Sequence, residues 1–216
     1  MNRALSPQEA WEHMVEGNTR FLRGDPSHPN QDATRRSQTA IAQRPLAALF
    51  GCSDSRLSAE IIFDQGLGDL FVVRNIGQVI SPSVIGSLEF AAEVLEVPLL
   101  VVLAHDSCGA VKAAIDVTLP GAAALPPHIQ TVIDQIEPAV RRVRESSGLS
   151  LGDEVDAESV GREHLRDTIS ELLTASELIG QRIADGRLAI VGANYQLHDG
   201  LVQADVIVGK IDHPAS

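Results

Sequence analysis

Three short apolar runs constrain the fold of this chain more than any other feature of its sequence. They span residues 46–50, 70–73 and 99–103, and turn-forming residues bound each of them. Strands of a parallel sheet have this composition because helices cover both of their faces. Between the second and third runs, apolar residues recur with helical spacing, at Val84, Leu88, Ala91, Ala92 and Leu95. A strand, a crossover helix and a strand in this order predict a parallel α/β sheet.

The remaining apolar runs extend this sheet. A fourth run, at 188–191, predicts another buried strand. Asp199-Gly200 is typical of a hairpin turn and leads into residues 202–208, where the alternation indicates an edge strand. We therefore predict an α/β fold with a mainly parallel central sheet, of about four parallel strands plus an antiparallel edge strand, flanked by helices.

Helical patterns occupy much of the rest of the chain. The Ser-Pro-Gln-Glu sequence at 6–9 is typical of a helix start, and the apolar face that follows it, beginning at Trp11, needs a partner in the domain or on another subunit. Two long helices are predicted between about residues 125 and 185, the first of them kinked at Pro138. The acidic, glycine-containing segment 146–159 between them predicts a mobile surface loop.

Composition excludes several classes of function. Lys and Arg total 17 against 29 Asp and Glu, a formal net charge of -12, which argues against nucleic acid or an anionic membrane as a partner. No apolar run approaches the roughly 18 residues of a membrane span, and no secretory signal is visible at the N-terminus. The two cysteines could form at most one disulfide, and a reducing compartment would keep them as thiols. We expect a cytoplasmic protein.

Both cysteines of the chain follow predicted strands. Cys52 comes directly after the first strand, and His105 and Cys108 come directly after the third. Because the carboxyl ends of the strands border the ligand crevice of an open α/β sheet, the three side chains converge if these two strands are neighbours. Two thiolates and one imidazole suit zinc, and three protein ligands leave the fourth position open for water, as in catalytic zinc sites.

Two other interpretations of these cysteines are weaker. A lone buried cysteine is more often a small hydrophobic residue than a ligand, but here both cysteines lie at strand ends and one is three residues from a histidine. A cysteine phosphatase loop would place five residues between its cysteine and arginine, whereas Cys52 and Arg56 are separated by three. A glycine-rich phosphate loop followed by lysine is also missing from the sequence.

At this point the sequence resembles a known family. The C-x-D-x-R motif at 52–56, followed by the H-x-x-C-G motif at 105–109, is similar to the double signature of the β-class carbonic anhydrases, in particular bacterial, actinobacterial-like members. The resemblance continues through 71–75 and extends from residue 43 to about residue 208. It implies a zinc lyase (carbonate dehydratase) that reversibly hydrates carbon dioxide to bicarbonate and a proton by means of hydroxide on zinc.

The resemblance assigns roles to five residues. One zinc ion per chain is implied on Cys52, His105 and Cys108. Asp54 is implied to accept a hydrogen bond from the hydroxide, while Arg56 keeps Asp54 ionised and turned away from the metal. In some members this aspartate instead binds zinc at lower pH, so Asp54 is also a possible fourth ligand in a closed state.

The resemblance also implies a substrate pocket made of Gln43, Phe71, Ile76, Phe90 and Gly109. Gln43 would donate an amide hydrogen bond to a substrate oxygen, and the three apolar side chains would favour linear, nonpolar carbon dioxide. Phe90 replaces a tyrosine of plant-type members, so one hydroxyl is missing here. Ordinary core packing is the alternative for Phe71, Ile76 and Phe90.

One subgroup of the family links site closure to bicarbonate bound beside a tryptophan, an arginine and a tyrosine. Arg74 and Tyr195 match this pattern, but Leu49 stands at the tryptophan position and the single tryptophan of the chain is Trp11. This departure argues against closure driven by bicarbonate and leaves closure driven by pH open.

Assembly and domain organisation follow from the same resemblance. It implies a homodimer or homotetramer, with the N-terminal helix embracing the partner and with Phe71 and Phe90 reaching across. Carbon dioxide and bicarbonate are the implied ligands, and neither nucleic acid nor membrane is an expected partner. We interpret residues 1–216 as one domain, with an N-terminal helical arm at 1–45 and a zinc-binding α/β core at 46–216.

Two other functions stay open from the sequence. Relatives on the same scaffold hydrolyse carbonyl sulfide or carbon disulfide, and a non-catalytic zinc protein could sense bicarbonate. Asp54 and Arg56 argue against an idle site. Asp106 is expected to cap a helix. The sequence does not select a proton shuttle, and most of the other histidines are expected at the surface: His13, His28, His128, His164, His198 and His213.

Overall fold

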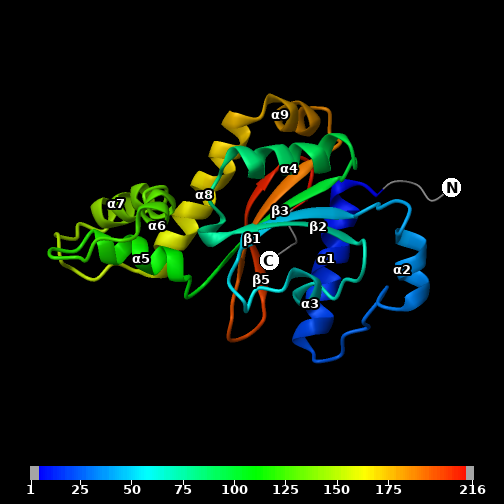
Figure 1. Ribbon diagram of the computed structural model, residues 1–216, viewed down its shortest axis with the longest axis horizontal. Helices are drawn as coiled ribbons and strands as arrows, with labels where there is room; N and C mark the ends of the chain where they lie inside the picture. The colour runs from blue at the N-terminus through cyan, green and yellow to red at the C-terminus, as the bar shows by residue number, and fades with distance from the viewer. Residues whose placement is uncertain (1–4, 213–216) are drawn as a thin grey trace.

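The computed structural model describes residues 5–212 and contains a five-stranded sheet in the order β2-β1-β3-β4-β5 (Figure 1). The first four strands are parallel, and β5 pairs with β4 in the antiparallel direction. The predicted sheet is therefore confirmed, including its antiparallel edge strand. The strands are β1 (Ala47–Cys52), β2 (Leu70–Asn75), β3 (Leu99–His105), β4 (Ala189–Tyr195) and β5 (Val202–Val208).

Every residue of β1 and β3 is buried, because helices cover both faces of the sheet. One face packs against α4 (Pro82–Glu93), α8 (Ala157–Ala175) and α9 (Glu177–Ala184). The core on the other face includes side chains from α1 (Pro7–Leu22), α3 (Ala59–Ile62), α5 (Gly109–Val117), α6 (Pro127–Ile133) and α7 (Glu137–Ser146). Figure 1 shows α5, α6 and α7 grouped at one end of the molecule, with α1 and α3 at the other.

The predicted start of the first helix is confirmed. The Ser6 hydroxyl accepts a hydrogen bond from the Glu9 amide (3.2 Å), and the Glu9 carboxylate accepts one from the Ser6 amide (2.8 Å). Trp11 and Met14 are buried against the sheet of the same chain, whereas Val15 keeps 41% of its surface exposed. Part of the apolar face of this helix is thus buried within its own domain.

The two predicted long helices are each broken in two. The expected kink at Pro138 is wrong, because α6 ends at Ile133 and Pro138 lies in the first turn of α7, where proline fits without losing a hydrogen bond. The second helix stops at Ser176, which is extended (φ -127°, ψ 99°) and accepts a hydrogen bond from the Ile179 amide at the start of α9.

Some short elements carry too little periodic signal to be predicted. The residues of α2 (Ala33–Thr39) are exposed or half-buried, and α3 has only four residues. A single turn of 3₁₀ helix, η1 (Ile76–Gln78), follows β2 directly. Within residues 5–212, no helix combines the length and the apolar character needed to cross a membrane.

The packing of α1 on α3 depends on a glycine. A Cβ added at Gly17 would lie 1.8 Å from the Phe63 carbonyl oxygen. We expect Gly17→Ala to lower the free energy of unfolding by about 1–3 kcal/mol, because the main chains must move apart. The measurement is urea unfolding followed by circular dichroism. Gly180→Ala in α9 is the control, because an added Cβ there meets nothing within 4 Å. This substitution should raise the free energy of unfolding by about 0.5–1 kcal/mol. A Gly17→Ala variant as stable as the wild type would contradict the observed packing.

Candidate metal centre

The parallel pairing of β1 with β3 brings three candidate ligands together. Cys52 is the last residue of β1, His105 is the last residue of β3, and Cys108 immediately precedes α5. Each residue offers one ligand atom, and these atoms all lie within 4.8 Å of one another. All three residues are buried. They form the one group of three or more histidine, cysteine or carboxylate side chains with metal-binding spacing within residues 5–212.

The orientation of His105 leaves one ring nitrogen available to a metal. Nδ1 lies 2.7 Å from the main-chain oxygen of Asp106, and since a carbonyl oxygen only accepts, Nδ1 carries the proton. Nε2 is buried and has no hydrogen-bond partner among the described residues. A ring with a main-chain partner on one nitrogen, and with its second nitrogen left over for an ion, is the usual arrangement of a metal-binding histidine.

The two thiols share a proton and a charge. The hydrogen bond from Cys108 lowers the pKa of Cys52 to about 4, and His105 and the amides of Gly77 and Asp54 act in the same direction, against the effect of burial. The same hydrogen bond to Cys52, together with burial, raises the pKa of Cys108. Of the two cysteines, Cys52 is therefore the one that loses its proton more readily. A donor set of two sulfurs and one imidazole fits zinc chemically.

Asp54 lies beside the cluster and faces Arg56. Arg56 donates two side-chain hydrogen bonds to the carboxylate (2.9 and 2.7 Å), and its main-chain amide donates a third (3.0 Å). These bonds hold the pKa of Asp54 well below its usual range, so the group is ionised. Arg56 also donates to the main-chain oxygen of Ser107 (3.2 Å), which links the loop after β1 to the loop after β3.

Arg74 fixes the main chain of the loop after β1. It donates to the carbonyl oxygens of Cys52 (2.9 Å) and Asp54 (2.6 Å). Tyr195 is buried at the end of β4, where its backbone pairs with His105, and Leu49 is buried in β1. The sequence alone gave no indication that the arginine holds the loop of the metal ligands.

The predicted substrate-pocket residues lie on several different elements of the chain. Gly109 follows Cys108 directly at the start of α5, and Gln43 is exposed before β1. Ile76 is 48% exposed after β2. Phe71 and Phe90 contact each other, with ring centroids 6.1 Å apart. Phe71 packs on the α4 face, whereas the core on the opposite face contains the two cysteines.

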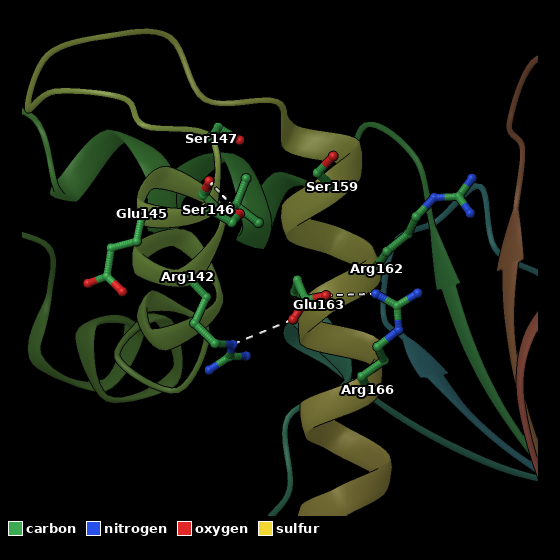
Figure 2. A pocket seen from close by; sticks show the side chains of 9 residues that line it. Arg142, Glu145, Ser146, Ser147, Ser159, Arg162, Glu163 and Arg166 are labelled. Carbon is green, nitrogen blue, oxygen red and sulfur yellow. Dashed lines mark hydrogen bonds and ion pairs between the residues drawn. The ribbon is translucent and has the colours of Figure 1, made fainter.

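One cavity borders the candidate site, and a second lies beside α8. One, of about 550 Å³, is bordered by Cys108, Gly109, Lys112 and residues 152–155. The other, of about 530 Å³, lies between α7 and α8 and is lined by three arginines (Figure 2).

Each arginine of the second cavity is paired with a carboxylate. Arg142 and Arg166 both pair with Glu163 (3.5 and 2.7 Å), and Arg162 pairs with Glu158 (2.8 Å). Figure 2 shows Glu163 between Arg142 and Arg166. The Arg142–Glu163 pair joins α7 to α8, whereas the other two pairs lie within α8. Arg142 also pairs with Asp167, and Arg166 with Asp205, so each positive charge of this cavity has a carboxylate partner.

The prediction that Asp106 caps a helix is wrong. Asp106 does not cap a helix, because α5 begins after Cys108. Its carboxylate instead accepts a hydrogen bond from the Leu197 amide (2.9 Å), beyond β4. Most of the other described histidines are exposed, as predicted, whereas His164 is buried in α8. A signal for its burial exists in the sequence, since it continues an i, i+4 row with the buried residues Val160 and Thr168. His213 lies outside the described residues.

Comparison with known proteins agrees with this geometry. The family model described as carbonic anhydrase matches residues 47–202. Carbonic anhydrase 2 of Mycobacterium tuberculosis is 49% identical over 210 residues, covering 95% of this chain and 96% of the relative. Carbonic anhydrase of Mycolicibacterium smegmatis is 45% identical over 206 residues, covering 95% and 97%.

A solved structure supports the same fold. Crystal structures described as two tetrameric β-carbonic anhydrases from Sordaria macrospora include a chain that aligns with a TM-score of 0.70 at 22% identity, covering 91% of this chain and 97% of that one. The resemblance predicted from the paired motifs is confirmed. By the family match and by the two mycobacterial relatives, this chain belongs to the carbonic anhydrase family, in its β class.

Proposed function

We propose that this chain is a zinc-dependent carbonic anhydrase that reversibly hydrates carbon dioxide to bicarbonate and a proton. The observation that carries the proposal is the buried group of Cys52, His105 and Cys108 with the ionised Asp54 beside it. When bound, zinc supplies a Lewis acid that lowers the pKa of a water molecule to about 7. The names of the mycobacterial relatives favour carbon dioxide over carbonyl sulfide or carbon disulfide as substrate, and favour an enzyme over a sensor.

The chain's own residues supply binding and orientation. The two thiolates and His105 Nε2 would hold the ion, while the main-chain oxygen of Asp106 accepts from His105 Nδ1 and keeps the ring in place. Asp54 stays anionic because Arg56 binds it. It can therefore accept a hydrogen bond from the reacting water and turn an oxygen lone pair toward the substrate carbon. Arg56 positions Asp54.

We extend the proposal to the substrate pocket and to assembly. Gln43 and the Gly109 amide would contact substrate oxygen. Ile76, Phe71 and Phe90 would form the apolar wall of the pocket. The two phenylalanines would reach this pocket across the interface of a homodimer or homotetramer. Support comes from apolar surface near the edge strand β2, where Ile76 and Phe90 are 48% and 44% exposed. A second chain that covers this surface stabilises the assembly.

We also propose a cytoplasmic location. Metal binding requires both cysteines to stay reduced, and Cys52 and Cys108 are free thiols with ligand atoms within 4.8 Å of each other. A reducing compartment prevents their oxidation to a disulfide.

The direct test is stopped-flow carbon dioxide hydration between about pH 6.5 and 9, on either side of the pKa of about 7 given above, with zinc content measured on the same sample. We expect rapid hydration that requires zinc and rises with pH. One zinc per chain with no hydration at any pH would contradict the proposed function. Carbonyl sulfide and carbon disulfide would then be the next substrates to assay.

Asp54→Asn tests the proposed role of the carboxylate. We expect one zinc per chain and a decrease of about 100-fold or more in kcat/KM, because the amide no longer accepts as an anion. Asp185→Asn is a matched control, since Asp185 also binds the arginine two residues later (2.6 Å to Arg187) but lies at the end of α9. Its turnover should equal that of the wild type. Wild-type turnover in a zinc-loaded Asp54→Asn variant would remove Asp54 from the mechanism.

Cys108→Ser tests the ligand assignment. A hydroxyl is a much poorer ligand for zinc than a thiolate, so we expect metal content to fall well below one per chain and the Tm to fall with it. Metal content by atomic emission and thermal unfolding give the two readouts. Ser107→Ala, which retains the main-chain oxygen that accepts from Arg56, is the neighbouring control. Full zinc occupancy in Cys108→Ser would overturn the assignment.

A further inference from the structure

His164 is a buried titratable group that the proposed mechanism does not use. It lies in α8, and only 3% of its surface is exposed. Its Nε2 lies 2.7 Å from the main-chain oxygen of Gly77 in η1, so Nε2 carries the proton and donates it. Nδ1 is buried and has no partner among the described residues. Burial lowers the pKa of His164, so the ring is neutral near pH 7.

The residue that His164 binds contacts the Cys52 thiol and lies against the first turn of α5. Gly77 is in the left-handed region (φ 67°), and a Cβ added there would lie 2.9 Å from the Ala110 Cβ, in the first turn of the helix that follows Cys108. Its amide also contributes a hydrogen bond to the Cys52 sulfur. Gly77 is therefore held between the end of β1 and the start of α5, and no side chain larger than hydrogen fits.

A second contact ties the same segment to α8. The Thr168 hydroxyl, one turn after His164, lies 3.4 Å from the main-chain oxygen of Gln78. Gln78 is also buried and also has a positive φ (42°), a conformation that needs support from its surroundings. Figure 1 shows α8 running from the α9 side of the sheet to the group of α5, α6 and α7, so it passes the ligand end of the sheet.

We infer that His164 is a positioning residue for the metal centre: by binding the Gly77 carbonyl, it holds the Gly77 amide against Cys52 Sγ. The inference rests on the proposed zinc site. Groups that hold a metal ligand in place by hydrogen bonds, without binding the metal themselves, contribute about 10- to 100-fold in metal affinity or activity. Loss of the imidazole would let η1 relax and would weaken the support of the Cys52 thiolate.

The test compares zinc release from the holoenzymes of His164→Gln and His164→Asn. The glutamine amide nitrogen can stand where His164 Nε2 stands, whereas the shorter asparagine cannot reach the Gly77 oxygen. We expect zinc release to an excess of chelator about 10-fold faster in His164→Asn, and near the wild-type rate in His164→Gln. After substitution of cobalt(II) for zinc, the sulfur-to-metal absorption bands should shift in His164→Asn alone.

Leu165→Ala controls for a general loss of stability. Leu165 is fully buried in the same helix, next to His164, but it faces the core on the α4 side. The Leu165→Ala variant should have a lower Tm, but the absorption bands of its cobalt-substituted form should not shift. Equal zinc release and equal spectra in the asparagine and glutamine variants, or the same changes in Leu165→Ala, would overturn the inference. A wild-type protein that binds zinc but does not hydrate carbon dioxide would contradict the proposed function and leave this test intact.

Discussion

The parallel pairing of β1 with β3 is the constraint on which the rest of the metal centre depends. Gly51 pairs with Leu103, so both strands end at the same edge of the sheet within two residues of this pair. Cys52 and His105 therefore meet without any long loop, and the turn after β3 needs only to bring Cys108 back. An antiparallel pairing would place the two strand ends at opposite edges. Helices cover both faces of the sheet, so the paired strands are buried and rigid. The ligands at the ends of these strands are therefore held by rigid elements.

Hydrogen bonds join the end of each parallel strand, or the loop that follows it, to that of the neighbouring strand. Arg74 of β2 binds two carbonyl oxygens of the loop after β1. Arg56 of that loop binds the Ser107 carbonyl after β3, and Asp106 binds the Leu197 amide after β4. Four consecutive strand ends are thus linked by polar contacts across the metal-binding edge. Ser107 has a positive φ (49°), and such a conformation persists where neighbouring contacts hold it.

Local patterns predicted the strands and the positions of the candidate ligands at strand ends, because both depend on short-range information. A continuous apolar run specifies a buried strand, and the position of a cysteine directly after it specifies the edge where its side chain lies. Other features depend on contacts between distant segments. The hydrogen bond of Asp106 to Leu197 spans 91 residues, and that of His164 to Gly77 spans 87. The break at Ser176 depends on a single residue that caps the next helix, which periodicity does not reveal.

The protonation of the two thiols determines how the centre responds to pH. The pKa of Cys52 is low because Cys108 donates to it, and the pKa of Cys108 is raised for the same reason. A dication that binds both sulfurs must displace the remaining thiol proton, so its affinity decreases as the pH falls. Arg56 keeps the pKa of Asp54 below its usual range, so Asp54 stays ionised while the thiols take up protons. In the proposed mechanism, protonation of Asp54 is therefore not what lowers activity at acidic pH.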